Sequence, residues 1–316
     1  MLIALTGVSG FLGRYTAAAL RRKGHRVRAL VRSAERPSQG EPAVDEWQVG
    51  DQYDPQAQSE LVAGVDAVIQ VAIDWAALNQ GPIANFERNV LGSLWLLEAS
   101  RRAGVRQFLF VSSLDVYGEI FSDRSLDETH PAWPGSIYGA YKAAVELHLK
   151  AYHAAYEMNT SAWRPATMYG LNPRLQKSLW FDLVKTVREG GEVSTDANGL
   201  VVHVEDVAEA LALALAVGDE SVAGQFYNLV DCVMKWQEAA EITRELTGSA
   251  AVIQDRQSRG PRHPFNPAKA VAFFDQHGNG TALRRGREGV TQYIAALLTE
   301  LPPDHIVERP QPGGLG

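Results

Sequence analysis

Tyr138 and Lys142 have the residue types and the spacing of a proton-transfer site, with Ser113 lying 25 residues upstream. They stand four residues apart in a helix-compatible stretch, and side chains at that spacing lie on one face of an α-helix. An ammonium beside a phenol favours the ionised phenol, so we expect Lys142 to lower the pKa of Tyr138 from its ordinary value of about 10. The pair could then exchange a proton with a substrate oxygen near neutral pH.

A glycine turn at the start of the chain supplies the other half of the chemistry. The apolar run Leu2–Thr6 leads directly into it, and an amphipathic stretch follows. Gly7 permits a tight reversal, Gly10 lets the backbone approach a pyrophosphate, and Gly13 allows close packing of helix on strand. Because free N–H groups and the helix dipole attract phosphates, the turn predicts a dinucleotide site, and the pattern as a whole predicts nicotinamide-dependent redox chemistry. The predicted contacts in the turn are Gly7, Gly10, Phe11, Leu12 and Gly13.

The residue after the second predicted strand bears on the choice of cofactor. This strand, His25–Val31, follows at the distance expected of a strand-helix-strand unit. An acidic residue at its end would accept both ribose hydroxyls of NAD, whereas an arginine suits the 2′-phosphate of NADP. Arg32 stands there, with Arg14 just after the glycine turn, so the sequence favours NADP. If Arg32 is only a surface charge, NAD stays open.

Composition argues against several other classes of function. The chain has 316 residues and a 46% hydrophobic fraction, which suits one large domain with a smaller appendage. A net charge of −7 without a basic cluster argues against nucleic-acid and membrane partners and favours a small-molecule substrate. A first strand at Leu2 leaves no room for a signal peptide, and no apolar run reaches the roughly 18 residues of a membrane span, so we expect a cytoplasmic protein. The single cysteine, Cys232, has no metal-ligand companions, so we expect no metal site.

Apolar strand candidates alternate with helical patterns, which predicts an α/β fold with a doubly wound parallel sheet of the Rossmann type. The later candidates are Ala67–Ala72, Phe108–Ser112, Ser161–Arg164 and Phe226–Val230. From about Arg164 the residue composition changes, with more proline and glycine, which predicts a smaller, interleaved substrate-binding region. We expect a dinucleotide-binding domain at 1–163 plus about 202–230, a substrate-binding region at about 164–201 plus 231–301, and a flexible tail at 302–316.

Motifs spread over residues 1–230 resemble the extended branch of the short-chain dehydrogenase/reductase family, also called the NAD-dependent epimerase/dehydratase family. They occur in the family's order and at its spacing. They are Thr6-Gly7-x-x-Gly10-x-x-Gly13, Asn89-Val90-x-Gly92-Ser93, the serine strand Phe110–Gly118, the Arg-Pro turn Arg164–Gly170 and the segment Val202–Ala208. The resemblance implies a Rossmann fold and a nicotinamide-dependent enzyme.

The resemblance also implies a role for each residue of the site. Tyr138 would be the acid/base on the reacting oxygen, Lys142 would hold the nicotinamide ribose, and Ser113 would hydrogen-bond the same substrate oxygen. A hydride transfer at carbon needs such a matched proton transfer at oxygen. The other implied cofactor contacts are Asp51 and Gln52 at the adenine, Val71, Ala72 and Ile73 along the cofactor, and Pro165, Ala166 and Met168 beside the nicotinamide.

Departures from the family pattern narrow the reaction. Sugar 4,6-dehydratases of the family carry an acid-base pair where this chain has Leu114 and Asp115, and Leu114 cannot donate a proton. Asp115 could act as a base beside a substrate carbon or simply stabilise the turn. Gly199–Val201 replaces the arginine that often meets the diphosphate in nucleotide-sugar enzymes. The predicted substrate-side residues are Trp75, Ser113, Leu114 and Asp115.

Three functions compete on these grounds. The first is an NAD(P)-dependent oxidoreductase or epimerase acting on a secondary alcohol or ketone, including that of a nucleotide-linked sugar. The second is an NADPH-dependent carbonyl or aldehyde reductase of a small non-sugar metabolite, and the third is a non-catalytic dinucleotide-sensing protein. The helix candidates Ile83–Arg102 and Ile137–Tyr156 match helices that pair across a two-fold axis in the resembling family, so a homodimer is expected.

Overall fold

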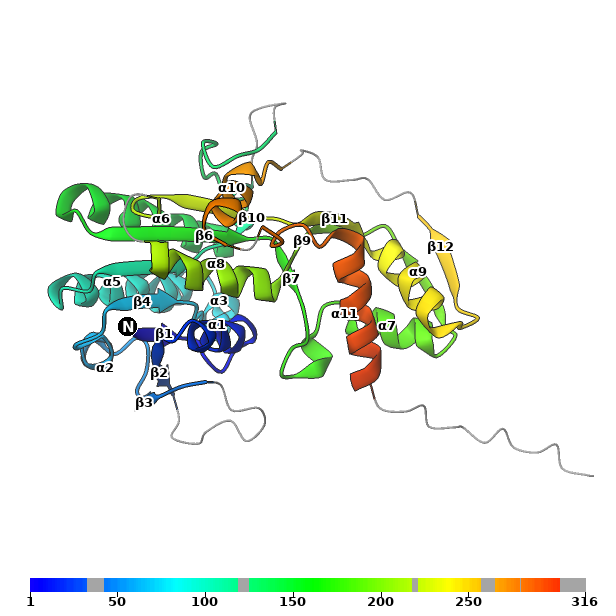
Figure 1. The fold of residues 1–316 in the computed structure, drawn as a ribbon, viewed down its shortest axis with the longest axis horizontal. Helices are drawn as coiled ribbons and strands as arrows, with labels where there is room; N and C mark the ends of the chain where they lie inside the picture. The colour runs from blue at the N-terminus through cyan, green and yellow to red at the C-terminus, as the bar shows by residue number, and fades with distance from the viewer. Residues whose placement is uncertain (33–42, 119–124, 218–220, 257–264, 279, 302–316) are drawn as a thin grey trace, which may run out of the picture.

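The computed structural model describes residues 1–32, 43–118, 125–217, 221–256, 265–278 and 280–301. Within these ranges a seven-stranded, all-parallel sheet has the order β10-β6-β5-β4-β1-β2-β3 (Figure 1). Its strands are β1 (Leu2–Thr6), β2 (Arg26–Val31), β3 (Glu46–Val49), β4 (Ala67–Gln70), β5 (Gln107–Val111), β6 (Asn159–Pro165) and β10 (Phe226–Leu229). The order reverses between β1 and β4, where doubly wound sheets bind ligands. The predicted doubly wound parallel sheet is confirmed.

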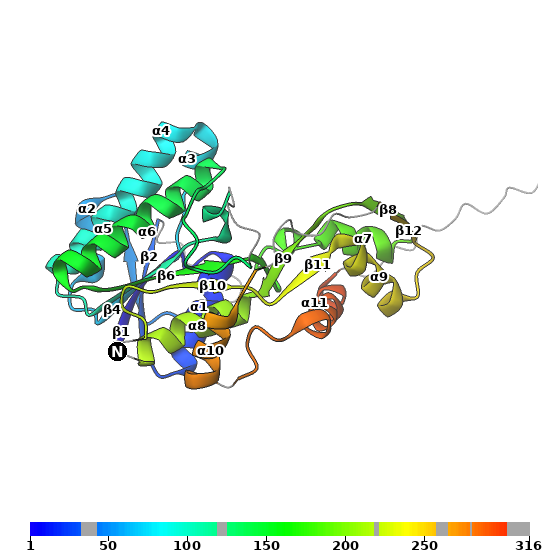
Figure 2. The same cartoon turned by 90° about the horizontal axis from the view of Figure 1, so that it is seen from above.

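Helices cover both faces of this sheet (Figure 2). Two apolar cores lie between the sheet and these helices, one under α2, α5 and α6 and the other under α1 and α8. The bounds are α1 (Phe11–Arg22), α2 (Pro55–Val62), α3 (Trp75–Gln80), α4 (Pro82–Asn85), α5 (Gly92–Arg102), α6 (Ile137–Tyr156), α8 (Val204–Val217) and α10 (Ala268–His277). The π-helix Phe86–Leu91 joins α4 to α5, and a 3₁₀ turn at Leu114–Val116 follows β5. The core therefore fixes the carboxyl edge of the sheet from both sides.

The start of α6 is set by a side-chain cap. The Ser136 hydroxyl accepts a hydrogen bond from the Gly139 N–H at 2.9 Å, which satisfies one of the free donors of the first turn. At the other end Glu157 adopts a left-handed conformation that stops the helix. The cap fixes the turn that carries Tyr138, with Lys142 one turn further on.

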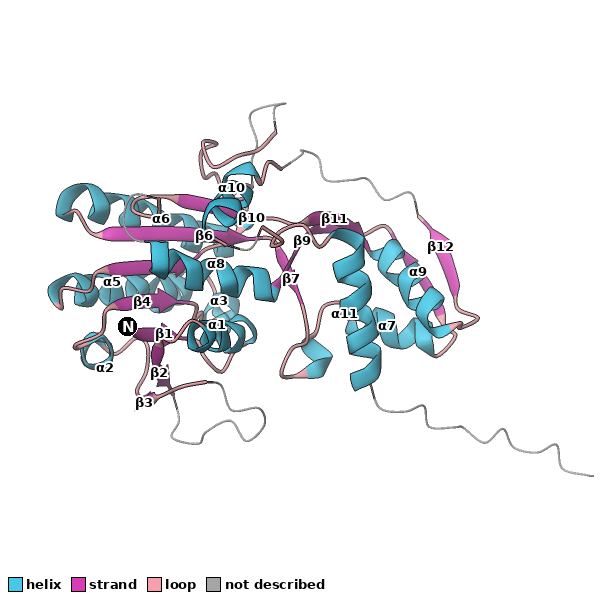
Figure 3. Ribbon diagram, viewed as in Figure 1, coloured by secondary structure: helices cyan, strands magenta, loops and turns pink. Residues whose placement is uncertain are grey.

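A smaller region lies beyond the carboxyl edge of the large sheet, as the helices and short strands of Figure 3 show. It contains a three-stranded sheet in the order β11-β9-β7 and a two-stranded sheet of β12 and β8. Its elements are β7 (Thr167–Tyr169), the 3₁₀ turn Leu175–Lys177, α7 (Phe181–Arg188), β8 (Glu192–Thr195), β9 (Asn198–His203), β11 (Cys232–Lys235), α9 (Trp236–Thr247), β12 (Val252–Asp255) and α11 (Gly286–Glu300). The chain leaves the large sheet after β6 and returns to it with α8 and β10, so the two parts are interleaved.

Several predicted elements differ in detail from the observed ones. The predicted helix Ile83–Arg102 is divided into α4, the π-helix and α5. The helix α10 lies within the stretch 231–301 that was predicted to bind the substrate, yet it packs against β10 and α8. The domain boundaries stay a prediction, and the predicted tail at 302–316 lies outside the described residues. Among the described helices, none combines the length and the apolar character needed to span a membrane.

Candidate active site

The glycine turn after β1 is shaped by backbone contacts. Gly7 has a φ of 76°, in the left-handed region that favours glycine. A Cβ on Gly13 would lie 2.1 Å from the Gly7 carbonyl oxygen, so only glycine allows α1 to approach the turn this closely. The Gly10 N–H donates to that same carbonyl at 2.9 Å. The first turn of α1 therefore begins directly at the sheet edge, as an anion site at a helix N-terminus requires.

A cleft of about 440 Å³ opens where the strand order reverses. The Thr6 hydroxyl joins the two central strands there, because it accepts hydrogen bonds from the N–H groups of Val71 (3.2 Å) and Ala72 (3.1 Å). The predicted residues that line the cleft are Gly7, Gly10, Phe11, Leu12, Gly13, Arg32, Gln52, Val71, Ala72, Ile73, Trp75, Ser113, Tyr138, Lys142, Pro165, Ala166 and Met168. Its volume falls in the range of small-molecule sites.

Three predicted site residues do not line this cleft. Asp51 instead faces Arg88, with 3.1 Å between its carboxylate and the Arg88 guanidinium, and it accepts a hydrogen bond from the Tyr53 N–H at 3.0 Å. Leu114 is partly buried against the apolar core, and Asp115 is exposed.

The sequence missed other residues of the cleft wall. Three of them lie at or just after the carboxyl end of a strand, namely Thr6, Leu30 and Gly50. Because ligands bind at the carboxyl ends of parallel strands, including every residue at such an end would have predicted them. Ser112, the residue before the predicted Ser113, also lines the cleft. Its hydroxyl is buried and has no hydrogen-bond partner within the described part of the chain. Such an unpaired buried group is rare and marks a place where a ligand could bind.

Lys142 and Tyr138 lie next to each other on α6. The Lys142 ammonium is buried and donates to the Val111 carbonyl oxygen at 2.7 Å. It lies 4.6 Å from the Phe110 ring centroid and 5.6 Å from that of Tyr138. The indole of Trp75, 57% exposed, stacks on the Tyr138 ring with 5.5 Å between centroids and 19° between planes. The phenol thus has a lysine on one side and an indole on the other.

Burial dominates the electrostatics of this pair. It raises the pKa of Tyr138 to about 12, while the Ser113 hydroxyl lowers it and the Asp115 carboxylate raises it. Burial also lowers the pKa of Lys142 to about 7, with Glu146 opposing the shift. The expected pKa of Tyr138 below its ordinary value is therefore wrong for this structure, because burial raises that pKa more than its neighbours lower it. Tyr138 is present here as a proton donor.

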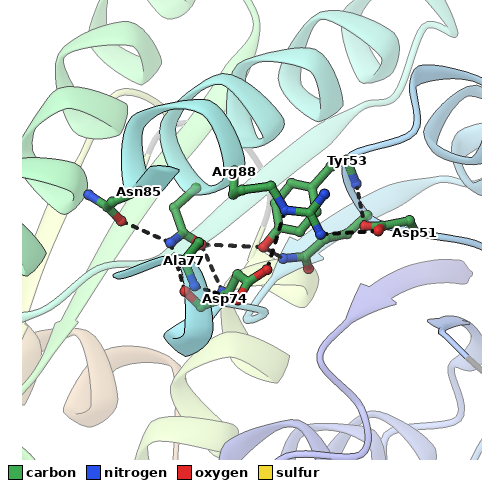
Figure 4. Close-up of polar contacts among 8 residues, drawn as sticks. Asp51, Tyr53, Asp74, Ala77, Asn85 and Arg88 are labelled. Atoms are coloured by element: carbon green, nitrogen blue, oxygen red, sulfur yellow. Dashed lines mark hydrogen bonds and ion pairs between the residues drawn. The ribbon is translucent and has the colours of Figure 1, made fainter. Parts of the chain in front are cut away.

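A polar cluster braces the turn after β4 (Figure 4). Asn89, on the π-helix, accepts from the Asp74 N–H at 2.8 Å and donates to the Asp74 carbonyl at 3.0 Å. Arg88 reaches the carboxylates of Asp51 at 3.1 Å and Asp74 at 3.4 Å, and its guanidinium lies 3.8 Å from the Tyr53 ring centroid. The family-like asparagine motif thus has a structural role beside the cleft, and Arg88 was not predicted to take part.

The residues present fit a nicotinamide dinucleotide. The glycine turn brings the start of α1 to the sheet edge, Arg32 follows β2 in the cleft wall, and the Ser112 hydroxyl and the buried Lys142 amine line the same cleft. Fold and site together define a Rossmann-type dinucleotide-binding enzyme. A sequence model of the NAD dependent epimerase/dehydratase family matches residues 3–229. The chain belongs to this family, which is the extended branch of the short-chain dehydrogenases/reductases predicted from its motifs.

Relatives of the chain span different reactions. A dTDP-glucose 4,6-dehydratase of Actinoplanes sp. is 30% identical over 70% of this chain and 71% of its own length. A 4-hydroxy-2-methyl-3-oxo-4-farnesyl-3,4-dihydroquinoline-1-oxide ketoreductase of Stigmatella aurantiaca is 31% identical over 86% of this chain and 79% of its own. The solved structure of MoeE5 in complex with UDP-glucuronic acid and NAD superposes with a TM-score of 0.77 at 25% identity, covering 95% of this chain and all of that one (100%).

Proposed function

We propose that the protein interconverts a secondary alcohol and a ketone, with Tyr138 as the acid/base on the reacting oxygen. The observation that carries this proposal is the position of Tyr138, Lys142 and Ser113 on one wall of the cleft that the glycine turn opens. A nicotinamide dinucleotide bound in that cleft supplies or accepts the hydride at the substrate carbon. The chain then has to move one proton at the oxygen.

The proton step follows from the environment of Tyr138. With its pKa raised to about 12, the phenol is protonated near neutral pH and is ready to donate to the oxygen of a ketone. The Ser113 hydroxyl interacts with the phenol and can hydrogen-bond the same oxygen. Lys142, held on the Val111 carbonyl, lines the same cleft, where it could bind a cofactor ribose hydroxyl and where its charge would stabilise the phenolate left behind.

Arg32 supports NADP as the preferred cofactor. It lines the cleft at the end of β2, where a guanidinium can bind a 2′-phosphate through paired hydrogen bonds. Titration with NADPH and NADH, followed by nicotinamide fluorescence, tests this preference. NADPH should bind about tenfold more tightly, and Arg32→Ala should remove the difference. Equal affinities in the wild type would return the choice to NAD.

The substrate class divides two candidate functions. The family and most of the named relatives favour a nucleotide-linked sugar. The exposed indole of Trp75 against Tyr138 and the similarity to a quinoline ketoreductase favour a small non-sugar ketone, and Leu114 lies where the sugar dehydratases need an acid. Cofactor stoichiometry separates an epimerase from a reductase, because an epimerase regenerates its nicotinamide whereas a reductase consumes it.

Exposed apolar side chains on α5 and α6 support a homodimer. Trp95 is 36% exposed, Leu147 69% and Tyr156 54%. Two copies that pair these helices about a two-fold axis would cover them in a four-helix bundle. Light scattering should give twice the mass of the 34.5 kDa chain, and Leu147→Lys should reduce that mass to the monomer's.

Tyr138→Phe tests the proposed chemistry. It should keep cofactor affinity and lower kcat by a factor of about 10² to 10⁴, because only the proton transfer is removed. Tyr156→Phe on the same helix is the matched control, since Tyr156 is exposed and lies outside the cleft. Retained turnover in Tyr138→Phe would overturn the mechanism. A wild-type protein that binds the dinucleotide tightly but turns over no carbonyl or sugar substrate would instead support a dinucleotide-sensing role.

A further inference from the structure

Arg88 has an unusual set of partners for a half-exposed arginine. Its Nη2 is 3.1 Å from Asp51, its Nε is 3.4 Å from Asp74, and its guanidinium lies over the Tyr53 ring at 3.8 Å (Figure 4). The ion pairs are partly solvated and long, so each contributes little to the stability of the fold. A planar guanidinium held by two carboxylates and a ring nevertheless has a fixed orientation. The role of Arg88 is therefore to hold its partners in a fixed arrangement rather than to stabilise the fold.

One arm of Arg88 acts on the substrate side of the cleft. Asp74 is the N-cap of α3, and its carboxylate accepts a hydrogen bond from the Ala77 N–H at 2.9 Å. Trp75, the first residue of α3, stacks on Tyr138. The carboxylate that orients this short helix is therefore the one that Arg88 contacts. A change in the position of Asp74 would change how the indole lies on the phenol.

The second contact of Arg88 is with the loop after β3. Asp51 lies in this loop, in which Gly50, Gln52 and Tyr53 line the cleft. The Tyr53 N–H donates to Asp51 at 3.0 Å, and the Tyr53 ring lies under the Arg88 guanidinium. A ligand that contacts this loop thus contacts the same cluster that holds Asp74.

We propose that Arg88 is a positioning residue that couples the adenine-side loop of the cleft to the orientation of Trp75 against Tyr138. This inference rests on the proposed function, because it takes the loop at Gln52 and Tyr53 to meet the adenosine part of the cofactor. The physical link consists of the ion pairs of Arg88 with Asp51 and Asp74, its contact with the Tyr53 ring, and the cap that Asp74 forms on α3. Filling the adenosine end therefore shifts the indole that faces the substrate.

Titration with ADP tests this coupling without any turnover. ADP carries the adenosine and diphosphate but no nicotinamide riboside, so it fills only the distant end. The emission of Trp75 is obtained as the difference between the wild type and Trp75→Phe, and again between Arg88→Met and the double variant. We expect saturating ADP to change the Trp75 emission in the wild type and to change it at least about threefold less in Arg88→Met. Arg88→Lys should restore part of the response, since an ammonium reaches one carboxylate.

Arg284→Met is the matched control. Arg284 pairs with Asp275 at 2.6 Å and has an exposed fraction of 44%, close to the 40% of Arg88, but its carboxylate partner is not part of the cluster at Asp51 and Asp74. Its ADP response should equal that of the wild type. Equal responses in the wild type and Arg88→Met at saturating ADP would overturn the coupling while leaving the cofactor site intact. No binding of ADP to the wild type would overturn the proposed cofactor placement, and the coupling with it.

Discussion

The carboxyl edge of the large sheet and the smaller region beside it differ in how their interiors are filled. At the sheet edge, backbone turns and short side chains leave a cleft of about 440 Å³. In the smaller region, rings fill the centre, with Trp180 stacked on Tyr169 at 6.4 Å and set edge-on to Trp236 at 5.5 Å. The open edge is defined by backbone geometry, which few residue types can satisfy, whereas the filled region tolerates any set of rings that packs. The first can be recognised from spacing, and the second cannot.

Trp180→Ala should have the largest effect, and it should change the stability of the fold without changing cofactor binding. Trp180 is 5% exposed within the aromatic core, so its removal should lower the free energy of unfolding by about 3–5 kcal/mol. Affinity for the nicotinamide cofactor should stay unchanged, because the cleft does not include this residue. Chemical unfolding and cofactor titration measure the two quantities, with the exposed Trp133→Ala as control. A fall in cofactor affinity would contradict the claim that the aromatic core of the smaller region does not affect the cleft.

Gly13→Ala should do the reverse. The new Cβ would meet the Gly7 carbonyl at 2.1 Å and push α1 away from the turn. The displaced turn would lose at least one N–H hydrogen bond to a phosphate, so cofactor affinity should fall by roughly 100-fold, since a hydrogen bond to a charged group contributes about 1.5–3 kcal/mol. In Gly199→Ala, the control from the smaller region, the Cβ has only ordinary contacts with Trp236, the nearest at 3.4 Å, and binding should be unchanged. Unaltered binding in Gly13→Ala would show that the turn does not hold the pyrophosphate.

Lys142→Met should show that the buried amine at the sheet edge lowers the stability of the fold. The amine has a pKa of about 7 in the fold against 10.5 ordinarily, so between those values the unfolded chain binds more protons and wild-type stability rises with pH. Below pH 7 the penalty is complete. The penalty corresponds to about 5 kcal/mol, and leaving the buried Val111 carbonyl without its donor offsets about 1–3 kcal/mol of it. The variant should therefore exceed the wild type in unfolding free energy by about 2–4 kcal/mol at pH 7, and this advantage should shrink towards pH 10. Thermal unfolding across this range measures it, and the exposed Lys177→Met should show no such trend.

Asp115→Asn should have the smallest effect. Its carboxylate raises the pKa of Tyr138 but does not line the cleft, so the variant should lower that pKa and change kcat/KM less than about threefold. A pH profile of kcat/KM measures both. A loss of 100-fold or more, on the scale of general-base catalysis, would give Asp115 the base role that the sequence left open.

The fold was predictable where one period or one motif decided it. The predicted bounds Ile137–Tyr156 are those of α6, because this segment has an apolar face at helical spacing. β3 was missed because Glu46–Val49 is short, half-exposed and polar at two of its positions. The packing of α10 on the large sheet depends on the contact of Phe273 with Trp163 and Tyr227, which join segments far apart in the sequence.

The site was predictable as far as the backbone determines it. Gly7, Gly13 and Tyr138 lie where their spacing placed them. The pKa of Tyr138 could not be foreseen, because it depends on burial by neighbours such as Trp75, which comes from another strand end. Arg88 was missed for the same reason, since its partners Asp51 and Asp74 are brought to it only by the fold.

The late return of the chain to its sheet has a consequence for synthesis on the ribosome. β10 covers the edge of β6, and α8 covers the apolar face of α1, yet both come from residues 204–229. While the growing chain is shorter than this, six strands are available but one edge of the sheet and one apolar face have nothing against them. Such surfaces pair readily with other chains. The nascent protein therefore passes through an aggregation-prone stage that ends only when residue 229 has emerged.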